Sequence, residues 1–269
     1  MHIAGSATQS YIAASATQSL LVAMQLSAPT MYNPAQCGVL WDVDGTLADS
    51  EILGFDATNE VLKANGVAAV TLADYKIGCR YTTPERFNYH LGMPTGADDG
   101  ARLGQLFDDM YVQLVSKKTA GLFDGIERLL RSLALNGHPQ GALSNACGAY
   151  VRAVVDANEL SEVPGQRLGL FKVALGADEV PAAKPAGDGL LKCCEAMQCV
   201  PAMSVYVGDS PSDGKAARAA GLKSIGVLWG ANDESALTGH FDVVVDSVPA
   251  LVKELRTQLV PPPEEPATE

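Results

Sequence analysis

The sequence predicts an α/β fold, a doubly wound, Rossmann-like parallel sheet with a helical cap inserted after its first strand. Two observations support this prediction. From Cys37 onward, short apolar runs alternate with helical patterns, as expected for parallel strands that helices cover on both faces. One interval, residues 48–120, breaks this alternation because it contains helical patterns but no strong strand pattern.

The elements of the expected core can be placed from these patterns. Apolar runs predict six strands, at Gly38–Val43, Gln140–Leu143, Val173–Gly176, Ser204–Val207, Ser224–Leu228 and Asp242–Val245. Helical spacing of apolar residues predicts helices between most of them, at Gly125–Asn136, Tyr150–Asn158, Gly189–Met197 and Ser212–Ala220. We therefore assign residues 37–47 and 121–258 to an α/β core domain.

The interval 48–120 is expected to form a small helical cap. Its clearest helix is Asp98–Lys117, which places Leu103, Leu106, Phe107, Met110 and Leu114 on one face, a stripe typical of core packing. The chain returns to the core near Gly121 and Gly125, which could act as hinges.

The two ends of the chain differ from the core in composition. Residues 1–36 lack Lys, Arg, Asp and Glu and contain SATQS twice, which favours a disordered extension. An organelle-targeting peptide is the alternative, although such peptides normally carry Arg. Residues 259–269 are rich in Pro and Glu and are also expected to be disordered.

Composition limits the partners of this chain. The formal net charge of −12 disfavours binding to nucleic acid or anionic lipid, and no apolar run reaches the roughly 18 residues of a membrane helix. The six cysteines show no disulfide or zinc spacing, so reduced thiols are expected. We therefore predict a cytoplasmic protein, or one in an organelle such as a plastid if residues 1–36 are a targeting peptide.

Polar groups follow four of the expected strands at their carboxyl ends, where ligands collect in parallel sheets. They lie in Asp42-Val43-Asp44-Gly45-Thr46, in Ser144-Asn145, at Lys184, and in the segment from Asp209 to Asp213. Taken alone, each of these four polar groups could belong to a turn or a helix cap. Together they predict one crevice, in which mutually repelling carboxylates would require a divalent cation such as Mg²⁺.

The segments LWDVDGTLADSE, ALSNA, GADEVPAAKP and VYVGDSPSDGKAARAAG resemble the haloacid dehalogenase superfamily, in its phosphatase branch with a helical cap. The last two segments are similar to phosphoglycolate and sugar-phosphate phosphatases. The resemblance implies roles for eight residues: Asp42 as nucleophile, Asp44 as general acid and base, Ser144, Asn145 and Lys184 as phosphate ligands, Asp42, Asp44 and Asp209 as metal ligands, and Asp213 and Thr46 in support.

These roles are chemically consistent with hydrolysis of a small phosphorylated metabolite. Mg²⁺ would relieve the repulsion between the Asp42 carboxylate and a phosphate dianion, and attack would give an aspartyl-phosphate. A phosphomutase with the same core residues remains an alternative, as does a non-catalytic binding protein on this fold. A dehalogenase is disfavoured because its chemistry requires neither Mg²⁺ nor the acid at Asp44.

Substrate selection is expected to come from the cap. Asp42 and Ser144 are 102 residues apart and Ser144 and Lys184 only 40, so the insertion lies in the first gap. Lys76, Arg80 and His90 are the candidates, and a solvated polar face is the alternative for each. Arg80 leads them, because a guanidinium can grip a carboxylate or a second phosphate with two hydrogen bonds.

Overall fold

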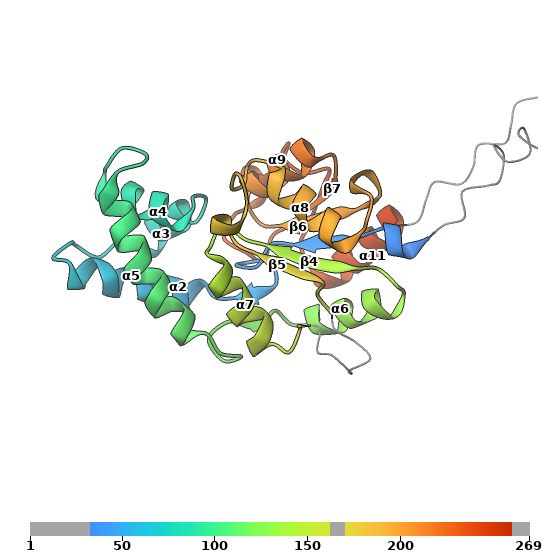
Figure 1. Cartoon of the computed structure of the whole chain (residues 1–269), viewed down its shortest axis with the longest axis horizontal. Coiled ribbons are helices and arrows are strands. Elements are labelled where there is room, and N and C mark those ends of the chain that lie inside the picture. Colours follow the sequence, from blue (N-terminus) through green and yellow to red (C-terminus); the bar gives the residue numbers. More distant parts are fainter. Residues whose placement is uncertain (1–32, 162–169, 260–269) are drawn as a thin grey trace, which may run out of the picture. The chain divides into compact units, whose positions relative to one another are not determined.

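The computed structural model describes residues 33–161 and 170–259 and confirms the predicted α/β fold. Its sheet contains six strands in the order β5-β4-β1-β6-β7-β8, and every neighbouring pair is parallel (Figure 1). The strands are β1 (Val39–Trp41), β4 (Gln140–Leu143), β5 (Val173–Leu175), β6 (Val205–Gly208), β7 (Lys223–Val227) and β8 (Val243–Val245). All six lie where the apolar runs predicted them, with ends that differ by at most two residues.

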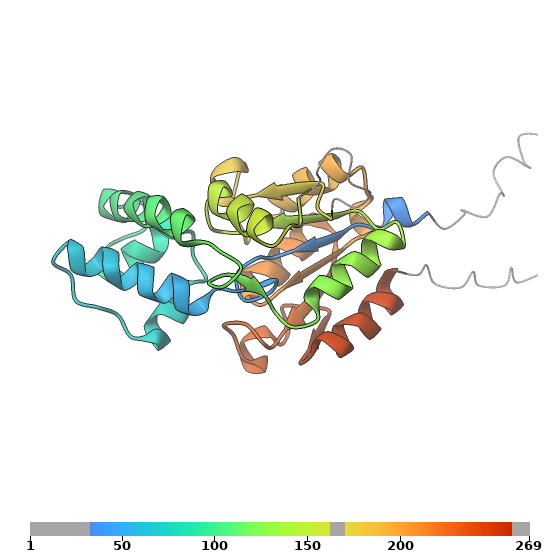
Figure 2. The ribbon, with the colours of Figure 1, turned by 90° about the horizontal axis from the view of Figure 1, so that it is seen from below.

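Helices cover both faces of this sheet. Successive side chains of a strand point to opposite faces, so the apolar strands need helices on both sides to be buried. Trp41 packs in the cluster formed with α6 (Ile126–Leu135), α7 (Gly148–Ala157) and α11 (Val248–Leu259), the face seen in Figure 2. Leu40 packs on the other face with α8 (Asp188–Met197) and α9 (Pro211–Ala220). The remaining elements of the core are short: η1 (Pro34–Gln36), η2 (Ala177–Glu179), η3 (Pro201–Met203) and α10 (Glu234–Leu237).

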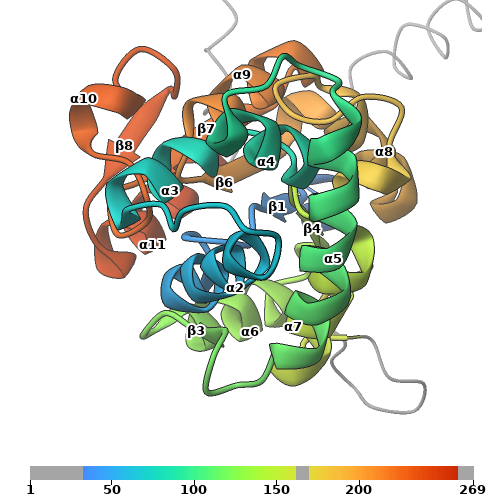
Figure 3. The same cartoon turned by 90° about the vertical axis from the view of Figure 1, so that its left-hand side faces the viewer.

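A helical insertion follows β1 (Figure 3). Its two connections to the core form an antiparallel ribbon of β2 (Ala48–Asp49) and β3 (Gly121–Leu122). The insertion itself consists of four helices, α2 (Glu51–Ala64), α3 (Leu72–Gly78), α4 (Thr83–Leu91) and α5 (Asp98–Leu114). We call residues 51–114 the insertion.

The prediction of an apolar stripe on α5 is only partly correct. Leu103 and Phe107 are buried as expected, but Leu106 and Leu114 are 45% and 44% exposed. The buried face continues instead to Tyr111, whose ring stacks on that of Tyr150 in α7 with centroids 4.3 Å apart. Contact with α7 of the core therefore decides which side of α5 is buried.

The predictions for the chain ends fall mostly on residues 1–32 and 260–269, which lie outside the described part of the chain. Two described segments differ from those predictions: Pro34–Gln36 form a 3-10 helix, and Leu259 is the buried last residue of α11. Among the described residues, no helix combines the length and the apolar character needed to cross a membrane.

Candidate active site

A cavity of about 330 Å³ lies at the carboxyl ends of the parallel strands and is lined from both the core and the insertion. The core contributes Asp42, Asp44, Ser144, Lys184 and Asp209 among its lining residues. Because these residues follow different strands of one parallel sheet, the topology brings them together although up to 167 positions separate them in sequence.

Asp42 is fixed by the strand that it follows and by the turn after it. Its N–H donates to the carbonyl of Val207 in β6, at 2.9 Å, which extends the ladder by one residue. Asp42 is 5% exposed, and its side chain accepts hydrogen bonds from Lys184 Nζ, at 2.6 Å, and from Thr46 Oγ1, at 3.3 Å. One Asp42 oxygen therefore bonds an ammonium group and the other a hydroxyl.

Lys184 joins two of the acidic groups. Its Nζ lies 2.6 Å from the Oδ1 atoms of both Asp42 and Asp213 and 3.0 Å from the hydroxyl of Tyr206. Asp213 is in turn fixed by a capping box at the start of α9, where its Oδ2 accepts the Ser210 N–H at 2.9 Å. The side chain of Asp213 thus holds the ammonium group of Lys184 in place.

Asn145 also acts on Lys184, although the sequence suggested a phosphate ligand. Its side-chain amide donates to the carbonyl of Lys184 and accepts from the N–H of Lys184, both at 3.0 Å. This pair of hydrogen bonds ties the loop after β4 to the loop that carries Lys184. Asn145 also lines the cavity.

Burial and mutual repulsion govern the electrostatics of the acidic groups. Burial raises the pKa of Asp42, and the nearby Asp213 and Asp209 add to this effect, which outweighs the opposing influence of Lys184. Burial and Asp213 raise the pKa of Asp209 to about 7. Burial alone would lower the pKa of Lys184, but the carboxylates of Asp213 and Asp42 raise it well above its usual value, so this ammonium group keeps its proton.

The carboxylates of Asp42, Asp209 and Asp213 suit a divalent cation. One oxygen from each lies within 4.8 Å of the others, and all three side chains are buried. Lys184 balances only one of the three charges, so a hard, doubly charged cation would compensate the rest. The carboxylate of Asp44, named as a ligand from the sequence, is not part of this group of described residues.

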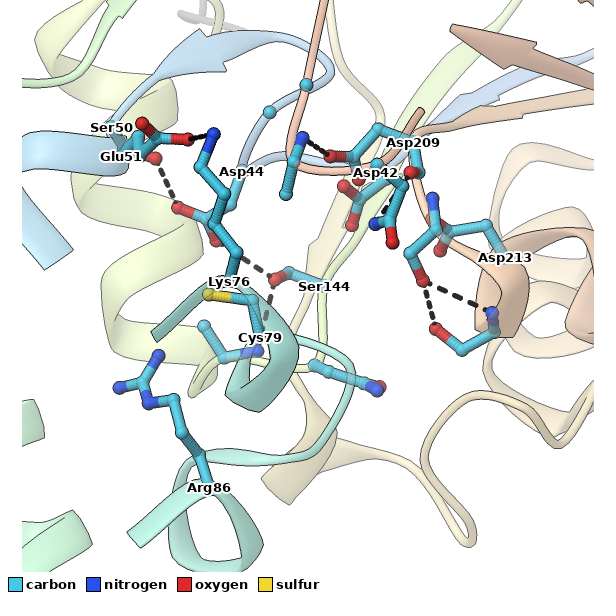
Figure 4. Close-up of a pocket in the computed structure, with 18 of the residues that line it drawn as sticks. Asp42, Asp44, Ser50, Glu51, Lys76, Cys79, Arg86, Ser144, Asp209 and Asp213 are labelled. Carbon is cyan, nitrogen blue, oxygen red and sulfur yellow. Dashed lines mark hydrogen bonds and ion pairs between the residues drawn. The ribbon is translucent and has the colours of Figure 1, made fainter. Parts of the chain in front are cut away.

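Asp44 instead faces a set of hydroxyl groups (Figure 4). Its Oδ1 accepts hydrogen bonds from Ser50 Oγ, at 2.6 Å, and from the hydroxyl of Tyr150, and its Oδ2 lies 3.4 Å from Ser144 Oγ. The hydroxyl of Tyr111 donates to that of Tyr150 at 3.0 Å. Asp44 is therefore held apart from the carboxylates that surround Lys184, and part of its surroundings comes from the insertion.

The loop after β7 was missed by the sequence interpretation. The N–H of Ala231 donates to Asp209 Oδ2 at 2.6 Å, and Asn232 Nδ2 donates to the carbonyl of Asp209 at 3.1 Å. Gly230 permits this approach, since a Cβ atom there would lie 2.2 Å from Asp209 Oδ2. The same rule that located the other loops, polar groups after a strand end, would have identified this one after the predicted strand Ser224–Leu228.

The insertion brings only one of its three predicted candidates to the cavity. Lys76 lines it, although its Nζ forms an ion pair with Glu51 at 2.6 Å. Arg80 does not line it, because its guanidinium turns to the core and donates to Asn232 Oδ1 at 3.0 Å. His90 also lies outside the lining, against Gly78, and burial lowers its pKa to about 4.

The guanidinium that does line the cavity belongs to Arg86, which the sequence interpretation missed. Arg86 is 8% exposed and lies in α4 (Figure 4). A signal was present in the sequence: Thr83, Arg86 and Phe87 have the i, i+3, i+4 spacing of one helix face, and all three are buried. An arginine on the apolar face of a short helix is unusual enough to mark a position inside the protein.

Comparison with known proteins agrees with this site. The family model for haloacid dehalogenase-like hydrolases matches residues 39–227, and the chain belongs to that family. Curated relatives of the chain are named phosphoglycolate phosphatase. The chain is therefore a phosphatase that resembles the phosphoglycolate phosphatases. The relative from Yersinia pestis is 30% identical over 229 residues, which cover 80% of this chain and 92% of that protein.

Solved structures show the same architecture. CbbY from Rhodobacter sphaeroides, in complex with phosphate, superposes with a TM-score of 0.66 at 25% identity, covering 81% of this chain and 95% of that one. A β-phosphoglucomutase from Clostridium difficile gives a TM-score of 0.67 at 17% identity, covering 82% of this chain and 96% of that one. At such low identity the second likeness concerns the fold alone.

Proposed function

We propose that this phosphatase hydrolyses a small phosphomonoester, of the phosphoglycolate or sugar-phosphate class, through an aspartyl-phosphate formed on Asp42. The observation that carries the proposal is the arrangement around Lys184, where a buried carboxylate that follows β1 meets an ammonium group and two further carboxylates. Mg²⁺, bound by Asp42 and Asp209 with Asp213 close by, would supply the charge that lets a carboxylate approach a phosphate dianion.

In the first step, an oxygen of Asp42 attacks phosphorus, and the bond between phosphorus and the ester oxygen breaks. Asp44 donates a proton to that departing oxygen, so the product leaves as a neutral alcohol. Lys184, together with Ser144 and the main-chain N–H groups beside it, stabilises the charge on the transferred phosphoryl group. Asp42 ends the step as an acyl-phosphate.

In the second step, water attacks the phosphorus of the acyl-phosphate, and Asp44 takes up the proton of that water. The bond between phosphorus and the Asp42 oxygen breaks, inorganic phosphate leaves, and both carboxyl groups return to their starting states. Asp44 suits both roles because its hydrogen bonds hold it on the side of the cavity that the insertion covers, where the leaving group would lie.

The size of the cavity supports a small substrate. A volume of about 330 Å³ lies at the low end of the range for ligand sites and suits a metabolite of a few carbon atoms. The names of the relatives, phosphoglycolate phosphatases, point to the same class.

A phosphate-release screen tests this function. We expect Mg²⁺-dependent release of inorganic phosphate, with phosphoglycolate among the better substrates and nucleotides among the poorer ones. Incubation with a sugar monophosphate distinguishes the alternative, because a mutase would yield an isomeric phosphate and no free phosphate. Absence of phosphate release from every small phosphomonoester would contradict the proposal.

Tyr150 is predicted to position Asp44. Replacing Tyr150 by Phe removes a hydroxyl that donates directly to Asp44. Tyr111→Phe instead removes a hydroxyl that lies closer to the Tyr150 hydroxyl than to Asp44. We expect Tyr150→Phe to lower kcat about three- to tenfold, with a smaller effect of Tyr111→Phe, because Ser50 still holds Asp44 in both variants. Steady-state kinetics measure the two effects, and a larger loss in Tyr111→Phe would refute this order.

A further inference from the structure

A chain of hydrogen bonds connects the insertion to the acidic cluster of the core. It begins at Arg80, in the turn after α3, whose Nη2 donates to Asn232 Oδ1 at 3.0 Å. Asn232 Nδ2 donates in turn to the carbonyl of Asp209 at 3.1 Å, and the N–H of the preceding Ala231 donates to Asp209 Oδ2 at 2.6 Å. Arg80 therefore reaches Asp209 through a single side chain, that of Asn232.

Burial makes the middle of this chain dependent on Arg80. Asn232 is 7% exposed, and both ends of its side-chain amide are used, Oδ1 by Arg80 and Nδ2 by the carbonyl of Asp209. Removal of Arg80 would leave Oδ1 as a buried acceptor without this donor, and the amide would gain by turning toward another one. The orientation of Asn232 thus depends on a guanidinium that the insertion supplies.

The loop after β7 is held closely on both sides of Asn232. Gly230 approaches Asp209 so closely that a Cβ atom there would lie 2.2 Å from Oδ2. Asp233 is the N-cap of α10, where its Oδ1 accepts the Ala236 N–H at 3.0 Å. A change in the orientation of Asn232 is therefore passed to Asp209, because the neighbouring residues have little room to absorb it.

We propose that Arg80 is a positioning residue for the metal: by docking on Asn232 it holds Asp209 ready to bind Mg²⁺, so that metal binding and docking of the insertion stabilise each other. This inference rests on the proposed function, in which Asp209 binds Mg²⁺, and adds control of that site by the insertion. Coupling between two binding events is reciprocal, so Mg²⁺ favours the docked insertion by the same factor by which docking strengthens Mg²⁺ binding.

The sign of the effect separates positioning from electrostatics. A guanidinium near a metal site repels a cation, so removal of its charge alone should strengthen Mg²⁺ binding. Loss of positioning acts in the opposite direction, because Asp209 is then no longer held for the ion. Weaker Mg²⁺ binding after neutralisation of Arg80 therefore identifies the hydrogen-bonded chain, and not the charge, as the cause.

Calorimetric titration of Mg²⁺ into the metal-free protein, without substrate, measures this effect. We expect Arg80→Met to raise the Kd for Mg²⁺ about three- to tenfold, since part of the free energy of one hydrogen bond from a charged donor is lost. Arg102→Met is the matched control, because Arg102 Nη1 also donates to an asparagine Oδ1, that of Asn65, at 2.8 Å, but within the insertion. It should leave the Kd unchanged. An unchanged or lower Kd in Arg80→Met, or an equal rise in Arg102→Met, would overturn the inference.

A double-variant cycle tests the route through Asn232. Asn232→Ala should also weaken Mg²⁺ binding, and the addition of Arg80→Met should raise the Kd no further, since the contact that Arg80 makes is already gone. If Arg80→Met weakens binding by the same factor with and without Asn232, Arg80 acts by another route and the inference is wrong.

The reciprocal effect can be measured without any change at Asn232. Mg²⁺ should slow amide hydrogen exchange in residues 78–82, the turn that carries Arg80, and this protection should be absent in Arg80→Met. Equal protection of the turn by Mg²⁺ in both proteins would show that the metal and the docked insertion are not coupled.

Both measurements omit substrate, which separates this inference from the proposed function. If the unmodified protein binds Mg²⁺ but releases no phosphate, the proposed function is wrong, whereas the Kd of Arg80→Met still decides the role of Arg80. If the unmodified protein does not bind Mg²⁺, the proposed metal and this inference are both wrong.

Discussion

Asp42→Asn should leave a folded protein with at least about a thousandfold lower kcat, because an amide cannot act as the nucleophile that forms the acyl-phosphate. The fold should survive, since asparagine has nearly the same shape and Lys184 keeps its contact with Asp213, at 2.6 Å. Phosphate release under saturating substrate measures the loss, and circular dichroism checks the fold. Asp56→Asn, the same change on the exposed side of α2, is the matched control and should retain full activity.

Chemical trapping makes this result specific to the nucleophile. Rapid acid quenching of the unmodified protein with radiolabelled substrate should leave label on the chain, and hydroxylamine should release it, as expected for an acyl-phosphate. Asp42→Asn should carry no label. Appreciable turnover in Asp42→Asn, or label that persists in it, would assign the nucleophile to another residue.

Removal of the metal should have an effect of similar size. Excess chelator should abolish phosphate release and Mg²⁺ should restore it, because the carboxylates of Asp42, Asp209 and Asp213 otherwise repel an anionic substrate. Asp209→Asn keeps the shape of the side chain but removes one charge, so we expect it to raise the Mg²⁺ concentration for half-maximal activity at least about tenfold. Full activity in excess chelator would refute the metal requirement.

The pKa shifts add a second readout for the metal that does not depend on activity. Burial raises the pKa of Asp42 and raises that of Asp209 to about 7, whereas the unfolded carboxyls titrate near about 4. Between these values the metal-free folded protein holds protons that the unfolded chain has lost, so its stability falls as pH rises through this window.

Mg²⁺ competes with those protons. We therefore expect Mg²⁺ to raise the Tm more at pH 8 than at pH 5, measured by thermal denaturation followed by circular dichroism. The increase at pH 8 should be smaller in Asp209→Asn. A Tm increase that is equal at the two pH values would show that these buried carboxyls do not hold the ion.

The sequence by itself determined the core and the residues that follow its strands. The central strands β1, β4 and β6 are short runs in which every residue is buried, whereas the edge strands β5 and β8 are only partly buried. Consecutive apolar residues therefore mark most of the sheet, and the prediction depends on local composition. The positions of Asp42, Ser144 and Asp209 follow from the same pattern, because each lies at or next to the carboxyl end of a predicted strand and parallel strands end at one edge.

Only the tertiary structure decided how the insertion meets that edge. Arg80 and Arg86 are only six positions apart, yet the first bonds Asn232 and the second enters the cavity beside Phe107. Similarly, the carboxylate of Asp44 lies with Ser50 and Tyr150 and outside the cluster of Asp42, Asp209 and Asp213. The physical reason is that a side chain's direction here depends on the packing of α3, α4 and α5 against one another and against α7, which are contacts between segments distant in sequence.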